Sequence, residues 1–438
     1  MVHSNRVSAV DNSTENRERV SYEGWLVEKV IPRTQEQLRF VRSLALSGSV
    51  RKGVKFWMEP AALNKSVQVL LSPEYKDFVD EHFADLGIEN RVLIANLQRL
   101  IDAEQSNVTM SPNLPELTDF RNFDITRYHS ADEVNQFLTV LGNQKRSLVK
   151  IINIGESSEG RPLLVTKIGK PQEGAKNAIW IDAGIHAREW IAPASALYMI
   201  YSFVTKYDTD RKIKELLDNL DFFVLPLANP DGYEYSRSTD RIWRKNRSKS
   251  YCSFWACCQG VDLNRNYGYH WGTSGTSANP CSDVYRGSEP FSEAESSSIR
   301  NFILERKASM KAFLTLHSFS QMWLIPYGYG TDPRSTPDDY DDLRILANEG
   351  AAAIEALHGS KYKVGNSAEL LYAASGSADD WAKGVVNVKY SYTLELRPSD
   401  SEVDDVSGFI LEPKHIVPTG QEVMAATMTV AKHVVDQN

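Results

Sequence analysis

Three residues with side chains that can bind a transition metal lie directly after predicted strands. His186 and Glu189 are three positions apart and follow the apolar run 178–182, while His317 follows the apolar run 313–316. Taken singly, a His-x-x-Glu pair is common on surface helices, and a histidine at a strand end is more often structural. Together, two histidines and one carboxylate at the carboxyl ends of strands are the protein ligands of an open catalytic zinc site. The pattern predicts one Zn²⁺ per chain, with a fourth position left for water.

The amino-acid composition limits the classes of protein to which such a site could belong. The chain has 438 residues, of which 42% are hydrophobic, so it can bury a sizeable core as two domains or as one large domain with an appendage. Its 49 Lys plus Arg against 57 Asp plus Glu give a net charge of -8, which offers no electrostatic reason to expect nucleic acid. The apolar runs are shorter than the roughly 18 residues that a membrane span needs, so we expect no membrane segment.

The first elements form a small unit of their own. Between residues 20 and 105, strands and helices are predicted in βαββαβ order, as in a ferredoxin-like α+β unit. Its second helix opens at Ser72-Pro73 and is predicted to bury one apolar face. The expected strands are 25–31, 54–58, 67–71 and 91–95, the first helix follows Thr34, and the buried face of the second comprises Phe78, Val79, Phe83 and Leu86.

The remaining chain has a different pattern. Residues 106–116 contain Ser, Asn and two prolines without apolar periodicity and are predicted to be a linker. From residue 117 to 438, strand-like runs such as 222–227 and 390–396 alternate with helical segments such as 192–206. This alternation indicates a large α/β domain with a mostly parallel or mixed sheet.

Several separated motifs in the second part occur together and in order. They are His-Ala-Arg-Glu-Trp-Ile at 186–191, Asn-Pro-Asp-Gly-Tyr at 229–233, Trp-Arg-Lys at 243–245, Asp-Leu-Asn-Arg-Asn at 262–266, His-Ser-Phe-Ser at 317–320 and Glu-Leu-Arg at 395–397. By these motifs the chain resembles the zinc metallocarboxypeptidases of the pancreatic A/B type from about residue 120 to its end. The unit before the linker resembles the activation segment of that family.

The resemblance implies a role for each matching residue at the reaction centre. His186, Glu189 and His317 match the zinc ligands. Glu395 matches the general base, and a carboxylate that ends an apolar strand is costly unless it is used. Arg244 matches the arginine that polarises the scissile carbonyl. From local sequence alone, Glu395 could be a salt-bridged strand end, and Arg244 part of a solvated basic loop.

The resemblance also implies how the substrate is held. Asn264 and Arg265 match the pair that binds the terminal carboxylate of the peptide, a task suited to the two parallel hydrogen bonds of a guanidinium group. Tyr372 matches the mobile tyrosine that closes over that carboxylate, although an exposed loop tyrosine without function would fit the local sequence as well. Arg188 matches a secondary arginine on the substrate side.

Two positions bear on specificity. Asp379 matches the base of the pocket for the C-terminal side chain, where a buried carboxylate favours a cationic partner and therefore Lys or Arg. Ser367 matches a wall position that is small in B-type enzymes. The alternative is that Asp379 and Asp380 only cap a loop. The chain departs from the family pattern at Phe319, usually tyrosine, and at Pro398, usually aspartate.

The four cysteines fall within 30 positions, which is typical of a local disulfide staple, with a zinc-thiolate site as the alternative. The family's single disulfide matches Cys258 and Cys281, which leaves Cys252 and Cys257 as a second pair. Disulfides and the family indicate a secreted protein. The polar residues 1–19 nevertheless lack the apolar segment of a secretory signal.

The predicted protein is a zinc exopeptidase of B-like specificity, monomeric, acting on peptide and protein C-termini and preceded by its activation domain. An A-type preference for apolar C-termini, a pseudoenzyme that only binds peptide C-termini, and a regulatory protein built on the ferredoxin-like unit are the alternatives. Activation requires an endoprotease. Between Arg99 and Arg121 there is no Lys or Arg, so a trypsin-like protease is expected to cut after Arg121, and a protease of other specificity within the linker.

Overall fold

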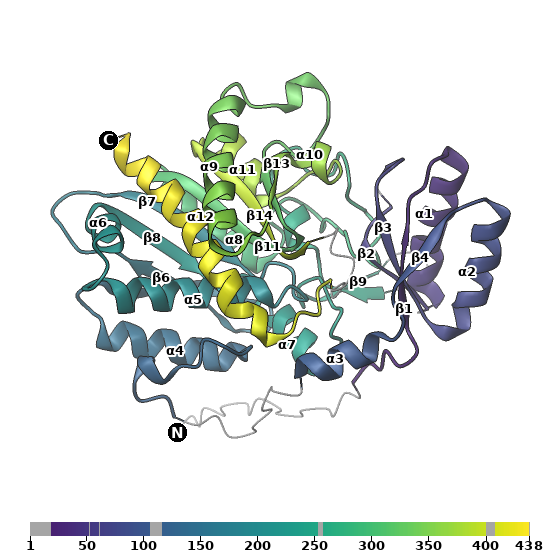
Figure 1. Ribbon diagram of the computed structural model, residues 1–438, viewed down its shortest axis with the longest axis horizontal. Coiled ribbons are helices and arrows are strands. Elements are labelled where there is room, and N and C mark those ends of the chain that lie inside the picture. The colour runs from purple at the N-terminus through teal and green to yellow at the C-terminus, as the bar shows by residue number, and fades with distance from the viewer. Residues whose placement is uncertain are drawn as a thin grey trace, which may run out of the picture.

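The structure is a computed structural model that describes residues 19–51, 53–60, 62–105, 116–252, 257–399 and 408–437. The predicted linker, apart from Glu116, therefore lies outside the described residues. Figure 1 shows two units side by side, a small N-terminal one in purple and blue and a large C-terminal one in teal to yellow. None of the helices in the described ranges is long and apolar enough to cross a membrane.

The N-terminal unit has the predicted βαββαβ order, followed by one more helix. Its antiparallel sheet has the strand order β2-β3-β1-β4. Apolar residues of β3 point to both sides of the sheet: α1 and α2 cover one face, and α3 packs against the other. The elements are β1 (Leu26–Val30), α1 (Gln35–Arg51), β2 (Val54–Met58), β3 (Val67–Leu71), α2 (Pro73–Asp85), β4 (Asn90–Ile94) and α3 (Leu97–Gln105).

One side chain of this unit differs from the prediction. Val79 and Phe83 of α2 are buried as expected, but Phe78 is 44% exposed. Phe78 packs instead against the His82 ring, with the ring centroids 4.2 Å apart. It precedes Val79 by about 100° of helical rotation and so lies beyond the stripe that faces the sheet.

The C-terminal unit is built on an eight-stranded mixed sheet of order β13-β12-β14-β11-β7-β8-β6-β5. The four central strands, β14, β11, β7 and β8, are parallel, and β6 and β12 join them antiparallel. Its strands are β5 (Val149–Glu156), β6 (Pro162–Ile168), β7 (Asn177–Ala183), β8 (Leu220–Leu225), β11 (Met310–Ser320), β12 (Met322–Ile325), β13 (Lys363–Asn366) and β14 (Tyr390–Ser399).

Helices cover both faces of this sheet. In β7, Ile179 and Ile181 face the layer that contains α4, α5, α9 and α12, whereas Ala178 and Trp180 face the layer of α8 and α11. Burial on both sides explains why β7 is an apolar run and not an alternating one. The helices are α4 (Ala131–Gln144), α5 (Ile191–Lys206), α6 (Arg211–Asn219), α7 (Pro230–Ser238), α8 (Ala294–Glu305), α9 (Tyr340–His358), α10 (Ser367–Leu370), α11 (Ala378–Gly384) and α12 (Ile416–Asp436). Short 3₁₀ turns lie at Phe120–Asn122, Leu263–Arg265, Pro333–Ser335 and Pro413–His415.

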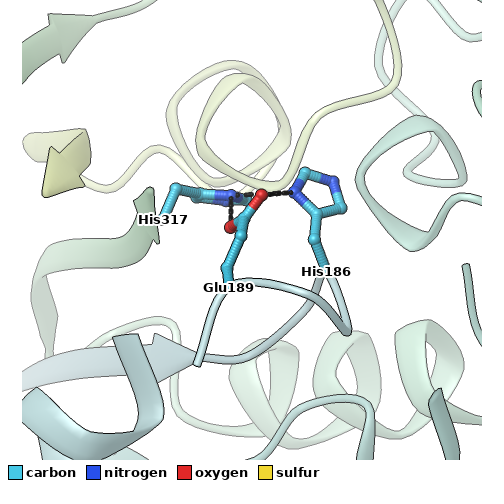
Figure 2. Close-up of side chains that lie close together, drawn as sticks. All are labelled: His186, Glu189 and His317. Atoms are coloured by element: carbon cyan, nitrogen blue, oxygen red, sulfur yellow. Dashed lines mark hydrogen bonds and ion pairs between the residues drawn. The ribbon is translucent and has the colours of Figure 1, made fainter. Parts of the chain in front are cut away.

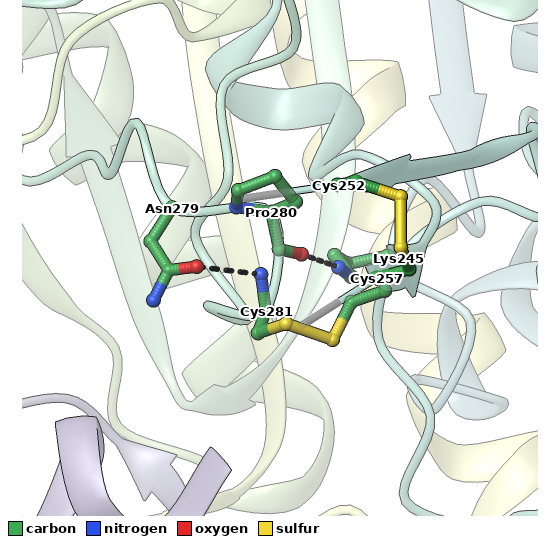
Figure 3. Close-up of a disulfide and its surroundings, with 7 residues drawn as sticks. Lys245, Cys252, Cys257, Asn279, Pro280 and Cys281 are labelled. Carbon is green, nitrogen blue, oxygen red and sulfur yellow. Dashed lines mark hydrogen bonds between the residues drawn. A yellow bond between two sulfur atoms is a disulfide. The ribbon is translucent and has the colours of Figure 1, made fainter. Parts of the chain in front are cut away.

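Two disulfides staple one region of the C-terminal unit (Figure 3). Cys258 is joined to Cys281, and Cys252 is joined to Cys257 across the short hairpin of β9 (Ser250–Cys252) and β10 (Cys257–Gln259). All four cysteines therefore form disulfides, which excludes the zinc-thiolate alternative. The buried Lys245 ammonium fixes the same loop by donating to the Pro280 carbonyl at 2.7 Å.

Candidate active site

Strand ends bring the three predicted metal ligands together. His186 and Glu189 lie in the tight connection between β7 and α5, and His317 lies in β11, the neighbouring parallel strand. The connection turns at Gly184, which has a φ of 70°, and a Cβ at that position would lie 2.9 Å from Pro193. The parallel strands end at the same edge of the sheet, which is why residues 131 positions apart meet.

The ligand atoms converge on one point (Figure 2). Glu189 Oε1 lies 2.8 Å from His186 Nδ1, Glu189 Oε2 lies 3.1 Å from His317 Nδ1, and the two Nδ1 atoms are 3.1 Å apart. All three residues are buried, and their ligand atoms lie within 4.8 Å of one another. Ligands about 2.0–2.1 Å from a tetrahedral zinc are about 3.3 Å from each other, so the donor set fits this ion in type and spacing.

The surroundings of the ligands support this arrangement. Glu189 also accepts a hydrogen bond from the Ser318 backbone N–H at 3.2 Å, which fixes its carboxylate. Burial lowers the pKa of His186, and the nearby Arg244 lowers it further. Burial opposes the charged form of His317, but the Glu189 carboxylate outweighs this effect and raises its pKa to about 9.

Asp262, which the sequence prediction missed, supports the site from behind. Its Oδ1 lies 3.2 Å from His186 Nε2, the ring nitrogen that faces away from the other ligands. Its Oδ2 accepts two hydrogen bonds from Arg244, at 3.0 and 2.8 Å. A carboxylate behind a ligating histidine fixes the ring's tautomer and orientation. Asp262 therefore connects the predicted metal ligand His186 with Arg244.

Glu395 lies next to His317 on the adjacent parallel strand β14, and the two residues are direct register partners. The carboxyl group lines the same cleft as the three ligands. Burial raises the pKa of Glu395 to about 8, against the effect of His317. A divalent cation at the adjacent ligand set would lower this pKa again, because it adds positive charge beside the carboxylate.

The three residues expected to hold a terminal carboxylate also meet in the cleft. The Asn264 side-chain oxygen accepts from the Ala378 N–H at 2.9 Å, which fixes the amide at the start of α11. Arg265 donates to the Gly275 carbonyl at 2.9 Å, and its Nη2 lies 3.4 Å from the Tyr372 hydroxyl. The guanidinium group and the tyrosine are thus presented on one wall of the cleft.

Asp379 and Ser367 also line the cleft. Asp379 lies in the first turn of α11 and is 3% exposed. The neighbouring Asp380 differs, because both of its carboxyl oxygens accept from the Gly328 N–H, at 2.8 and 2.9 Å. Asp380 therefore has a structural partner, while Asp379 lies at the cleft.

Arg188 is the predicted site residue that does not line the cleft. It is buried beneath the N-terminal unit and donates to the Phe56 carbonyl at 3.3 Å. Its guanidinium group lies over the Phe409 ring, 4.3 Å from the centroid, and 3.7 Å from the Asp283 carboxylate. Arg188 therefore contacts the N-terminal unit and does not line the cleft.

The N-terminal unit closes one side of the cleft. Trp57 and Met58 at the end of β2 are among its lining residues. The Trp57 ring packs edge-on against Phe319 and Phe409, at centroid distances of 6.3 and 5.6 Å. Beyond Met58, burial raises the pKa of Glu59 to about 7; Asp283 raises it further, and Arg244, Arg188 and Arg265 lower it.

Comparison with known proteins identifies this architecture. Residues 134–426 match the model of the zinc carboxypeptidase family, and residues 29–104 match that of the carboxypeptidase activation peptide. The chain belongs to the zinc carboxypeptidase family. It is an enzyme of that family, preceded by an activation peptide, and we refer to its N-terminal unit as the prodomain and to its C-terminal unit as the carboxypeptidase domain.

Relatives named carboxypeptidase A2 and carboxypeptidase B are both similar to this chain. Carboxypeptidase B of Astacus astacus is 44% identical over 72% of this chain and 99% of its own length. Carboxypeptidase A2 of Mus musculus is 38% identical over 95% of each chain. Among solved structures, thrombin activatable fibrinolysis inhibitor superposes with a TM-score of 0.83 at 33% identity, covering 95% of this chain and all of the other.

Proposed function

We propose that the protein is the zymogen of a zinc-dependent carboxypeptidase that removes Lys or Arg from the C-terminus of peptides and proteins. The observation that carries the specificity is the Asp379 carboxylate, which is buried and lines the cleft, as does the small Ser367. A lysine or arginine side chain would neutralise this charge, whereas a large apolar side chain would leave it buried and unpaired.

His186, Glu189 and His317 would hold zinc, which supplies Lewis acidity toward the scissile carbonyl and toward water. Glu395 accepts the proton of the attacking water and passes it to the leaving amine. Arg244 donates to the carbonyl oxygen, on which negative charge develops, and its two hydrogen bonds to Asp262 keep it in position.

The terminal carboxylate of the peptide would be bound by Asn264 and Arg265 and covered by Tyr372. Recognition of a free carboxylate limits cleavage to the last residue, because an internal peptide bond offers no anion at that point. Arg188 is free to contact substrate only after the prodomain has left, since Phe56 now accepts its hydrogen bond.

We further propose a division into prodomain 20–105, linker 106–116 and carboxypeptidase domain 117–438, with the enzyme secreted and monomeric. An endoprotease would cut within the linker or after Arg121. The Arg121 side chain is 70% exposed, although it pairs with Asp119 at the start of the first 3₁₀ turn. Because Arg121 is exposed but paired with Asp119, cleavage after Arg121 competes with cleavage within the linker.

The test compares hydrolysis of peptides ending in Lys, Arg, Leu and Phe before and after limited proteolysis, with sequencing of the new amino terminus. The proposal expects activity to rise on cleavage and to be highest for Lys and Arg. Preference for Leu or Phe would replace the B-like assignment by the A-like one. Binding of peptides without hydrolysis in any zinc-loaded form would indicate a pseudoenzyme.

A further inference from the structure

The chain contains four Asn-x-Ser/Thr sequons, at Asn12, Asn64, Asn107 and Asn246. In a secreted protein this pattern is the acceptor for an N-linked glycan, provided that the asparagine lies at the surface of the fold. Asn12 and Asn107 lie outside the described residues. The structure therefore allows a comparison of Asn64 in the prodomain with Asn246 in the carboxypeptidase domain.

Asn64 has the environment that an attached glycan needs. It is exposed and lies in the turn between β2 and β3, with a φ of 60°, a left-handed conformation that asparagine adopts more readily than most residues. Its backbone N–H donates to the Pro32 carbonyl at 2.8 Å, which holds the turn in place. Its side chain makes no hydrogen bond with any described residue. The side-chain amide can therefore carry a substituent without breaking a contact of the fold.

The hydroxyl group of the same sequon has no partner in the fold. The Ser66 side-chain oxygen is shielded from solvent, and none of the described residues forms a hydrogen bond with it. Buried hydroxyl groups in proteins usually have such a partner, so packing does not explain a serine at this position. The sequon does explain it, because the third residue must carry a hydroxyl group for the asparagine to be recognised.

Asn246 has the opposite environment. It is fully buried, and its Nδ2 donates to Glu293 at 2.9 Å and to Glu295 at 3.0 Å. Its Oδ1 accepts from the Val261 N–H at 2.8 Å. A glycan on Nδ2 would take away one of the two hydrogen bonds to the buried carboxyl groups and would have to fit into a closed interior. The folded carboxypeptidase domain therefore excludes a glycan at Asn246.

We infer that Asn64 is an N-glycosylation site, and that the N-linked carbohydrate of the secreted chain is confined to the segment before the activation cleavage, so that the activated enzyme carries none. The inference rests on the proposed secretion and zymogen function. A cut after Met110 or after Arg121 leaves Asn246 as the only sequon of the larger fragment.

The modification uses a lipid-linked oligosaccharide diphosphate as its second substrate. A bond forms between the Asn64 side-chain nitrogen and the anomeric carbon of the first sugar, while the bond from that carbon to the diphosphate oxygen breaks. The lipid diphosphate leaves with the electron pair of the broken bond, and the amide nitrogen loses one proton to the solvent. Nothing is oxidised or reduced in this transfer.

To test the site, the full chain is expressed behind a secretory leader in insect cells. The secreted protein is mapped by peptide mass spectrometry before and after treatment with a peptide N-glycosidase, which converts a glycosylated asparagine to aspartate. This conversion is expected at position 64, whereas the peptide that contains Asn246 should be unmodified. An unmodified Asn64, or a glycan at Asn246 in the secreted protein, would overturn the inference.

Four variants assign the glycan to the sequon. Asn64→Gln removes the acceptor and Ser66→Ala removes the recognised hydroxyl group, so each should lower the mass of the secreted protein by the same single glycan. Ser66→Thr preserves the sequon and should retain the glycan, which separates loss of the motif from loss of folding. Ser248→Ala disrupts the buried sequon and is the matched control that should leave the carbohydrate unchanged. Unchanged carbohydrate in both Asn64→Gln and Ser66→Ala would refute the assignment.

A protease site inserted between Met110 and Ser111 tests the confinement of carbohydrate to the prodomain. After cleavage and denaturation, all carbohydrate should be found on the smaller fragment, and the larger one should have the mass of its sequence. Carbohydrate on the larger fragment would overturn the inference. These measurements do not depend on catalysis. If the glycosylated chain hydrolyses no C-terminal residue after cleavage, the glycan assignment stands and the proposed enzyme function fails.

Discussion

Two clusters of charge differ in how the chain connects their members: the candidate metal ligands His186, Glu189 and His317, and the ion pairs that Asp240 and Arg241 form with the prodomain. In the first cluster, the negative Glu189 lies between two histidines of the same domain. In the second, Asp240 and Arg241 have their counter-charges, Lys55 and Glu104, in the prodomain. After cleavage between the domains, all residues of the first cluster remain in one polypeptide, whereas those of the second belong to two polypeptides that can separate.

This difference shows that burial of an ion pair has two uses in one molecule. Within a domain, a buried pair fixes the geometry of groups that must not move. Between domains, burial of an ion pair raises the free energy needed to separate them, because each charged side chain loses its partner before water can solvate it. The four predictions below concern the active site first and the covering of its cleft by the prodomain last, from the largest expected effect to the smallest.

Removing a ligand should have the largest effect. His317→Ala leaves one histidine and one carboxylate, too few to hold zinc tightly, so bound metal and activity should both be lost. Elemental analysis of the purified variant measures the metal directly. His358→Ala, an exposed histidine on α9, serves as the control and should keep one zinc per chain. Full zinc occupancy in His317→Ala would remove this residue from the ligand set.

Glu395→Gln should retain zinc and peptide affinity but reduce kcat about 10³-fold, because the amide cannot accept a proton from water. Single-turnover kinetics on the activated enzyme separate this loss from any change in binding. Glu412→Gln, an exposed glutamate paired with Lys414, is the control. Turnover close to that of the wild type would exclude Glu395 as the base.

Asp379→Ile should change the ratio of kcat/KM for Lys against Leu substrates by about 100-fold in favour of Leu, since a buried charge is replaced by apolar surface. Asp379→Asn keeps the shape of the side chain and isolates the contribution of its charge. An unchanged ratio in both variants would place the specificity determinant elsewhere in the pocket.

The smallest effect concerns the pH dependence of prodomain release. The pKa of Glu59 is raised from 4.5 to about 7 in the docked state, chiefly by burial, so docking takes up a proton. Docking is therefore favoured below about pH 4.5 and weakens as the pH rises toward about 7, where the carboxyl group ionises among Asp283 and the arginines of the cleft.

Dissociation of the cut prodomain should accordingly be several-fold faster at pH 8 than at pH 5. Glu59→Gln should flatten this dependence, while Glu74→Gln on the exposed face of α2 should preserve it. A pH profile that is the same in the wild type and Glu59→Gln would assign the dependence to another group.

Much of the fold could be predicted because its signals are local. The βαββαβ order of the prodomain and the strands that end near His186, His317 and Glu395 follow from apolar runs and turn residues. The prediction that Phe78 is buried was wrong, because spacing alone does not decide which side chain at the edge of a helical stripe reaches the core.

The contacts between distant segments could not be predicted from local patterns. Asp262 lies 76 positions from His186, and Glu104 lies 137 positions from Arg241. In the sequence, Glu104 is one charged residue of a short amphipathic helix, and such residues are usually solvated. Only the packing of the two domains gives it a partner, so its role depends on tertiary structure.

The register pairing of His317 with Glu395 has a consequence for how the enzyme fails on heating. A catalytic base on a loop can move away from a metal ligand while the rest of the protein stays folded. The distance between His317 and Glu395 is instead fixed by neighbouring strands at the centre of the sheet. The distance between them changes only when the pairing of β11 with β14 opens. These central strands belong to the most cooperatively folded part of such a domain. Thermal inactivation should therefore coincide with loss of amide hydrogen-exchange protection in β11 and β14, whereas the loop that carries Tyr372 loosens at lower temperature.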